Sequence, residues 1–275
     1  MTKSHNTMSQ TLNDLNNKAK NLPPVQADHS TRKFTVPSGR IAAAGLRFQA
    51  WAEKLIVKAS LNGDPYTYDP AVFPWVGEVS AEWKLIRAEL DQVMQVRDQI
   101  PSFQDILKEA EAITKDDSWK TFFLTGIGMD CAENAKQCPE TMRILQKIPG
   151  MKTAFFSILA PKKHIPAHRG AYNGLLRLHL GLQVPEPAEH CRIRIGNEFH
   201  HWNEGQPLIF DDTFNHEVWN DTDGYRVVLF IDFVRPLRQP WHWINNMILS
   251  IGALAPFMRE AGNKQKKWEK KFYKK

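Results

Sequence analysis

The second half of the chain alternates between apolar and polar residues with a period of two, a pattern typical of β-strands that bury one face. Proline and glycine residues separate the apolar runs at short intervals: Pro161, Pro166, Gly170, Pro185, Gly196, Gly205 and Gly224. Many short strands with regular turn residues favour an all-β sandwich or jelly roll. We therefore expect strands at 153–159, 175–184, 191–195, 206–210, 214–219 and 225–234.

The first half of the chain follows a helical period instead. Apolar residues recur every three or four positions between 40 and 60, while basic residues gather on the other side: Arg40, Arg47, Lys54 and Lys58. This pattern predicts an amphipathic helix with a basic face, which carries too much charge to span a bilayer. Helical spacing returns at 79–114, with a break near Pro101, and a further helix is expected at 139–148.

The patterns together predict five regions along the chain. These are a mobile tail at 1–39, the amphipathic helix at 40–60, a helical and mixed lead-in at 61–150, a jelly-roll core at 151–240, and an apolar segment with a Lys-rich tail at 241–275. The apolar part of the last region, 241–258, is uncharged, but its Asn, Gly and Pro residues make it unsuited to span a membrane.

Composition and charge limit the class of protein. The 275 residues are 42% hydrophobic, which suffices for a proper core, and the net charge of +6 comes from seven lysines between Lys264 and Lys275. The basic surplus thus belongs to an arm, and no nucleic-acid partner is expected. Three widely spaced cysteines favour a reducing compartment, and the polar start of the chain shows no signal peptide.

Polar residues inside two of the expected strands are the first candidates for chemistry. Arg177 and His179 alternate with leucines, so they share one strand face while the leucines face the scaffold. A buried guanidinium needs an anion, and a carboxylate matches its planar geometry. Arg226 is placed similarly, although Arg177 or Arg226 taken alone could equally pair with a structural carboxylate such as Asp232.

Two histidines are candidate metal ligands. His216 lies in the expected strand 214–219, and a hairpin to 225–234 would make it a diagonal neighbour of Arg226, at about 7–8 Å. His168 lies on an expected loop just before a strand. Two imidazoles near a jelly-roll mouth suit an iron site, with open positions for 2-oxoglutarate and oxygen. A core role for His216 and a surface role for His168 remain the simpler alternatives for each residue alone.

The usual iron triad adds a carboxylate two residues after the first histidine, and here that position is Gly170. Asp211 and Asp212 are possible substitutes. Both precede a strand, however, and capping the turn before His216 is the expectation for them. The residues alone therefore leave the metal site incomplete.

The stretch from Phe155 to Leu237 resembles the aspartyl/asparaginyl β-hydroxylase family. The resemblance rests on the strings HIPAHRGAYNGLLRLHLGL, CRIRIGNE, WNEG, LIFDDTFNHEVWNDTD and RVVLFIDFVRPL. It implies a mainly β fold, a double-stranded β-helix with a helical N-terminal region and flanking amphipathic segments. It also implies an enzyme that uses iron(II), 2-oxoglutarate and oxygen to hydroxylate a C–H bond.

The resemblance also implies roles for individual residues. The iron ligands fall at His168 and His216, and the 2-oxoglutarate contacts at Ser157, Arg177, His179 and Arg226. Many members lack the carboxylate ligand, so Gly170 fits the family.

The substrate is a separate question, because relatives in this family hydroxylate either Asp and Asn side chains or the acyl chains of bacterial lipids. The amphipathic helix and the apolar segment followed by lysines suit a bilayer surface. We therefore expect a lipid A or ornithine-lipid type of substrate, and a cytoplasmic protein at the inner face of the membrane. The alternatives are an Asp/Asn β-hydroxylase and a non-catalytic jelly-roll binding module.

Overall fold

The computed structural model describes residues 51–274 together with Asp14. Residues 51–59 are helical, as expected for the second half of the amphipathic helix. The first half of that helix and the mobile tail expected at 1–39 lie outside the described residues, apart from Asp14.

Ten strands form two antiparallel sheets in the described part of the chain. The large sheet has the order β1 (Thr67–Tyr68), β8 (Pro207–Phe210), β5 (Leu175–Gln183), β10 (Arg226–Val234), β3 (Met151–Leu159), β2 (Trp119–Thr125). The small sheet has the order β4 (His164–His168), β9 (His216–Asn220), β6 (Cys191–Ile195), β7 (Glu198–His201).

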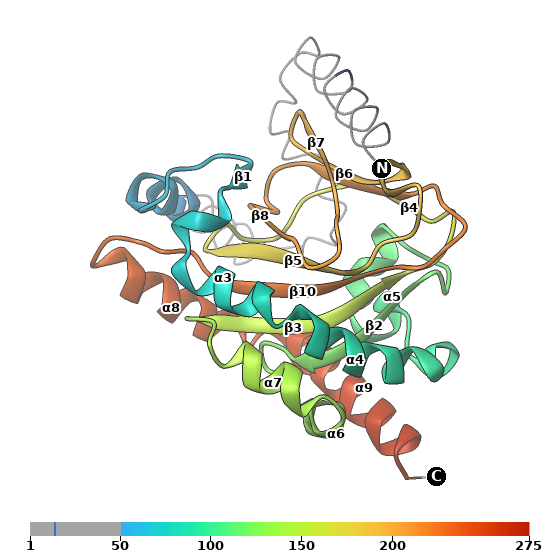
Figure 1. Cartoon of the computed structure of the whole chain (residues 1–275). Helices are drawn as coiled ribbons and strands as arrows, with labels where there is room; N and C mark the ends of the chain where they lie inside the picture. The colour runs from blue at the N-terminus through green and yellow to red at the C-terminus, as the bar shows by residue number, and fades with distance from the viewer. Residues whose placement is uncertain (1–13, 15–50, 275) are drawn as a thin grey trace.

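Helices cover the outer face of the large sheet (Figure 1). Those on or beside this face are α3 (Pro74–Ala81), α4 (Trp83–Gln95), α6 (Ala132–Gln137), α7 (Pro139–Leu145), α8 (Trp241–Gly252) and α9 (Pro256–Phe272), with short 3-10 turns at η2 (Pro70–Val72) and η3 (Arg97–Gln99). In contrast, α5 (Phe103–Ile106) and η4 (Lys108–Ala112) pack against the inner face near β2 and β3, where Ile106 joins Phe123 and Phe155, and η5 (Ala188–His190) contacts β6 and β7. Leu176, Leu178 and Leu180 of β5 join the core beneath this layer, together with Ile86 and Leu90 of α4. The alternation in β5 thus buries its leucines under helices.

A second core fills the space between the two sheets. Val228 of β10 meets Ile193 of β6 and Val218 of β9, and Trp202 and Phe210 complete the filling. Because the strand period is two, the polar partners of the β5 leucines point into this same space. Polar side chains in the interior between the sheets are therefore the candidates for a functional site.

The double-stranded β-helix predicted from the sequence is confirmed, with two antiparallel sheets face to face and flanking helices. The large sheet recruits two strands from before residue 150, β1 and β2, which the pattern did not reveal. Most of the Lys-rich tail, from Lys264 to Lys271, belongs to α9. Among the described helices, each is too short or too polar to cross a membrane.

The hairpin expected between 214–219 and 225–234 is wrong. β9 pairs with β4 and β6 in the small sheet, whereas β10 pairs with β3 and β5 in the large one. The chain crosses from one sheet to the other at Asn220–Gly224. His216 and Arg226 therefore belong to opposing sheets and are not diagonal neighbours within one.

Candidate active site

Two histidines lie side by side on the small sheet. His168 ends β4, and it is paired in register with His216, the first residue of β9. Their ring centroids are 4.1 Å apart, with the planes inclined by 53°. Both side chains are buried. The prediction that His168 lies on a loop is wrong. His168 is the last residue of strand β4, and its pairing with His216 of β9 sets its position.

The environment of both imidazoles leaves one nitrogen of each available. The Nδ1 atom of His168 lies 2.8 Å from the carbonyl of Pro166, and that of His216 lies 3.0 Å from the carbonyl of Phe214. A carbonyl can only accept, so each Nδ1 carries the proton and each Nε2 keeps its lone pair. Neither Nε2 has a hydrogen-bond partner among the described residues, which is the state required of a metal ligand.

Burial also keeps the two imidazoles neutral. It lowers the pKa of His168 to about 4, with a smaller lowering by the nearby charge of Arg177. Burial, followed by His168 and Arg177, likewise holds the pKa of His216 well below its ordinary value. Both rings are therefore neutral at neutral pH, with the proton on Nδ1, and each Nε2 is suited to bind a divalent cation.

Arg226 projects from β10 into the interior between the sheets. Its side chain is almost fully buried, and its Nε and Nη1 atoms have no hydrogen-bond partner. The guanidinium lies over the ring of Trp202, with Cζ 4.5 Å from the ring centroid. Burial lowers the pKa of Arg226 to about 10, which leaves it charged at neutral pH. No ion pair joins this cation to a carboxylate of residues 51–274, so the site favours an anionic ligand.

Two further side chains near Arg226 have unused polar atoms. Both ring nitrogens of His179 and the Nε1 of Trp202 are buried without a hydrogen-bond partner. The ring of His179 lies 6.0 Å from that of Trp202 and 5.0 Å from that of Phe210, measured between centroids. Burial, followed by the nearby charges of Arg226 and Arg177, holds the pKa of His179 well below normal. Orphaned polar atoms that cluster in one interior usually indicate a missing ligand.

Ser157 lies on the same inner face, opposite Val228 of β10. Its hydroxyl accepts a hydrogen bond of 3.0 Å from the indole nitrogen of Trp119. A hydroxyl that accepts one bond can still donate another. Ser157 thus remains able to contact a ligand in the interior.

Arg177 differs from Arg226, although both were expected to contact 2-oxoglutarate. Its Nη1 lies 2.8 Å from Asp212, and its Nε lies 2.9 Å from Asp232, the residue directly opposite in β10. The guanidinium also lies over the ring of Phe230, at 4.0 Å. The chain itself therefore neutralises Arg177, whose pairing with Asp232 was the simpler alternative in the sequence.

The position beside Gly170, where the usual iron triad has a carboxylate ligand, is occupied by the side chain of another residue, Asp212. A Cβ atom added at Gly170 would lie 2.1 Å from Oδ2 of Asp212, so the Asp212 carboxylate already fills that space. Asp212 does not cap the turn but pairs with Arg177. Asp211 does cap it, accepting from the amide and hydroxyl of Thr213 at 2.9 and 2.6 Å.

No cluster of three His, Cys, Asp or Glu side chains is placed to hold a metal in the part of the chain that the structure describes. The donor set for a cation consists of the two imidazoles. Trp202 and Trp119 are the interior residues that sequence reasoning did not single out. Trp202 opens the WNEG string, but a tryptophan before a polar turn gives no sign that it stacks on an arginine.

Comparisons with known proteins show what the chain is similar to. Residues 80–236 match the family model described as Aspartyl/Asparaginyl beta-hydroxylase. The chain is 50% identical over 224 residues to an ornithine lipid ester-linked acyl 2-hydroxylase from Rhizobium tropici, covering 82% of this chain and 80% of that protein. It is also 36% identical to the human aspartyl/asparaginyl beta-hydroxylase over 60% of this chain, but that match spans only 22% of the human protein. Among solved structures, a Pseudomonas putida prolyl-4-hydroxylase aligns with a TM-score of 0.39 and 16% identity, covering 56% of this chain and 88% of that one.

Proposed function

The chain belongs to the aspartyl/asparaginyl β-hydroxylase family, and on this premise we propose that it hydroxylates an acyl chain of a membrane lipid of the ornithine-lipid type. The cofactor is iron(II) and the co-substrates are 2-oxoglutarate and oxygen. The substrate class is supported by the Rhizobium tropici relative, which matches over most of both chains. The human relative matches over a small part of its own length, so it supports an Asp or Asn substrate less well.

His168 and His216 hold the iron in this proposal. Each offers an unprotonated Nε2 while a backbone carbonyl fixes Nδ1, at 2.8 Å for His168 and 3.0 Å for His216. Imidazole nitrogen is a suitable donor for iron(II), and two protein ligands leave the other positions to co-substrate, oxygen and water. Because Asp212 fills the space beside Gly170 and is paired with Arg177, it is not assigned as a ligand.

Arg226 binds the carboxylate of 2-oxoglutarate that lies away from the metal. The unpaired guanidinium supplies the charge, and the indole of Trp202 beneath it fixes its plane. His179 and Ser157 supply polar contacts on the same inner face. Arg177 acts as a positioning residue, because its pair with Asp212 holds the segment that leads to His216, and its pair with Asp232 joins β5 to β10.

When bound, iron(II), 2-oxoglutarate and oxygen would supply the chemistry that replaces a C–H bond by a C–OH bond: one atom of O2 enters the new hydroxyl group, and the other enters succinate as 2-oxoglutarate loses carbon dioxide. The protein orients the co-substrate and keeps bulk water out. Phe210 contributes to both tasks, with its ring 5.0 Å from His179 and 5.9 Å from His216, measured between centroids. The observation that carries the proposal is the combination of two imidazoles with unused Nε2 atoms and a buried guanidinium without an anion.

Purified protein supplied with iron(II) and 2-oxoglutarate tests the proposal. We expect succinate release that rises on addition of detergent-solubilised ornithine lipid, and a lipid product heavier by one oxygen in mass spectrometry. His168→Ala and His216→Ala should each lose bound iron and lower the rate at least about 1,000-fold, since each removes half of the protein's ligands. Stimulation by an Asp-containing peptide in place of the lipid would refute the substrate class. Absence of both iron and succinate would favour a binding module.

A further inference from the structure

α8 turns its apolar residues outward. Trp243, Ile251 and the following Leu254 expose 65%, 62% and 62% of their surface, whereas Asn245 is fully buried beside Leu249. This is the reverse of an ordinary amphipathic helix, which buries its apolar face. The exposed residues therefore lack the core contacts that would explain their character.

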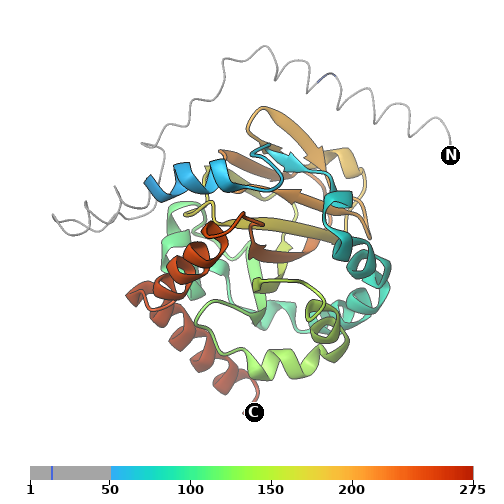
Figure 2. The ribbon, with the colours of Figure 1, turned by 90° about the vertical axis from the view of Figure 1, so that its left-hand side faces the viewer.

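The exposed residues form one continuous strip, which we call the outer stripe: Trp243, Met247, Ile251, Leu254 and Phe257. Their spacing of four, four, three and three places them along one side of α8 and over the corner that leads into α9. That corner projects from the body at the left of Figure 2. A row of neighbouring exposed apolar side chains on a folded domain marks an interaction site.

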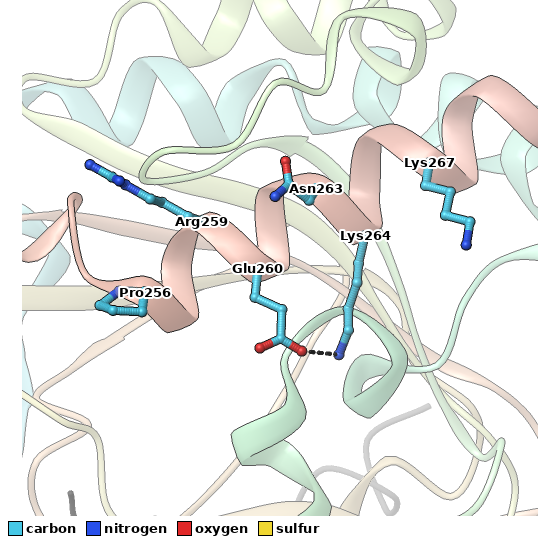
Figure 3. Close-up of a pocket in the computed structure, with 6 residues that line it drawn as sticks. All are labelled: Pro256, Arg259, Glu260, Asn263, Lys264 and Lys267. Carbon is cyan, nitrogen blue, oxygen red and sulfur yellow. Dashed lines mark ion pairs between the residues drawn. The ribbon is translucent and has the colours of Figure 1, made fainter.

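Basic residues continue the surface along α9. A shallow hollow on the outside of this helix is lined by Arg259, Lys264 and Lys267, against the single carboxylate of Glu260. Figure 3 shows Lys264 paired with Glu260, while Arg259 and Lys267 extend from the same stretch of helix. An apolar surface next to an excess of cations is complementary to the anionic surface of a bilayer.

We propose that the outer stripe and the cations of α9 dock this chain onto an anionic lipid bilayer, which presents the acyl substrate. This inference rests on the proposed function and names the surface through which the enzyme reaches its lipid. α8 is too short to span a bilayer, so it lies in the interfacial plane with the stripe inserted. Apolar insertion and basic attraction are the two signals that stable peripheral binding requires.

The docking surface is tied to the candidate active site. The loop at 169–174 follows His168 directly. Asn245, on the inner side of α8, forms hydrogen bonds with two residues of this loop, Tyr172 and Gly174. Its Nδ2 donates to the carbonyl of Gly174 at 2.8 Å, and its Oδ1 accepts from the hydroxyl of Tyr172 at 2.8 Å. Docking through α8 would thus place a bilayer next to the loop that directly follows the candidate iron ligand His168.

The helix at 51–59 lies on the same side of the molecule. Asn173 of the same loop donates to the carbonyl of Glu53 at 3.1 Å, and Ile56 and Ala59 pack with Leu237 in a cluster that includes Trp241 at the start of α8. Figures 1 and 2 both place this helix and α8 on one side. The two amphipathic segments therefore flank the active-site loop together.

Vesicle flotation of the full chain tests the proposal without any turnover. We expect the protein to float with vesicles of equal parts phosphatidylcholine and phosphatidylglycerol, and less with phosphatidylcholine alone. The double variant Ile251→Glu/Leu254→Glu should lower the partition coefficient about tenfold or more, because it removes two inserted side chains. Lys264→Glu/Lys267→Glu should lower it by a similar factor, but only on the anionic vesicles.

Leu85→Glu is the matched control, because Leu85 is also an exposed apolar residue on a helix, in α4 on the covered face of the large sheet. This variant should float like the unmodified chain. Equal flotation of Ile251→Glu/Leu254→Glu and the unmodified chain would overturn the proposal, as would an equal loss in Leu85→Glu. A dimer that the double variant converts to a monomer would assign the stripe to a second copy of the chain.

The same variants separate this inference from the proposed function. None of the substituted residues lies in the candidate active site, so all should hydroxylate detergent-solubilised ornithine lipid at the unmodified rate. Flotation without lipid hydroxylation in detergent refutes the proposed function alone. Hydroxylation in detergent without flotation refutes the docking surface alone.

Discussion

At the scale of single residues, the two buried arginines of β10 and its C-terminal end show what distinguishes a binding group from a structural one. Arg226 and Arg235 are both almost fully buried. Arg235 is paired with Asp64 at 2.9 Å and with Asp211, whereas Arg226 has no carboxylate partner within the described residues. A buried cation without a carboxylate partner costs several kcal/mol, so the proposed role of Arg226 as a ligand-binding group predicts that it destabilises the free protein.

Replacing Arg226 by methionine should therefore separate binding from stability. Arg226→Met removes the charge that binds the distal carboxylate, and the KM for 2-oxoglutarate should rise about 100-fold or more. The free energy of unfolding without 2-oxoglutarate should stay the same or increase, because a buried unpaired charge is lost. Steady-state kinetics and urea unfolding measure the two effects.

The matched control for this prediction is Arg235→Met. It leaves the carboxylates of Asp64 and Asp211 without their cation, and it should lower the unfolding free energy by about 3–5 kcal/mol. If Arg226→Met were equally destabilising in the absence of 2-oxoglutarate, Arg226 would have a structural role and the ligand assignment would fail.

The sequence pattern predicted which residues face the interior but not which of them are paired. Alternation with leucines placed Arg177 and His179 on one face of β5, as the structure has them. The pairing of Arg177 with Asp232 follows from the register of β5 against β10, where the two residues are directly opposite. Register across strands so far apart in the chain is a tertiary property that local alternation does not determine.

At the scale of elements, the crossing from β9 to β10 explains the wrong hairpin. The turn residues Asn220-Asp221-Thr222-Asp223-Gly224 are typical of a hairpin, but here they connect two sheets. The buried Nδ2 of Asn220 donates to the carbonyls of Leu159, Ala160 and Gly224, at 3.3, 2.9 and 2.9 Å. These bonds fasten the turn to the end of β3 and thereby set its path.

Asn220→Ala should consequently be severely destabilising. It leaves three buried carbonyls with one donor fewer, and it also removes the acceptor of the Thr222 hydroxyl at 2.6 Å. We expect a loss of about 2–4 kcal/mol of unfolding free energy, measured by urea denaturation. Asp223→Ala in the same turn is the control, since this exposed side chain pairs only with the exposed Lys162. It should change stability by less than about 0.5 kcal/mol, and an equal effect of both variants would refute this account of the turn.

Strand β4 was not predicted from the sequence because its local pattern is interrupted. β4 contains Pro166 and has a register shift between Ile165 and His168, so the alternation of apolar and polar residues is interrupted just before His168. Proline normally argues against a strand, and it is tolerated here because β4 is an edge strand. The six runs of alternation expected as strands, in contrast, all correspond to strands, because burial of one face requires the alternation.

At the scale of the whole molecule, one short loop joins the candidate active site to α8. Residues 169–174 begin at His168 and end at Gly174, whose carbonyl accepts from both Asn245 of α8 and the amide of Arg235, at 2.8 and 3.0 Å. The helices that flank this loop also carry exposed apolar residues, Trp51 on one and Trp243, Met247 and Ile251 on α8. A substrate that arrives along α8 thus meets a loop whose position depends on α8 itself.

Loosening this connection should affect how well oxidation is coupled to the lipid. Asn245→Ala removes the bonds to Gly174 and Tyr172 while leaving the histidines and Arg226 untouched. Succinate release without lipid should stay near the unmodified rate, whereas the amount of hydroxylated lipid per succinate should fall severalfold, because a loose loop positions the acyl chain poorly. The two products are measured together by mass spectrometry, on lipid in detergent. Asn246→Ala is the control, since Asn246 bonds within α8, to the carbonyl of His242 at 3.0 Å. If both variants kept full coupling, the loop would not transmit the position of α8 to the iron site, and docking and chemistry would be independent.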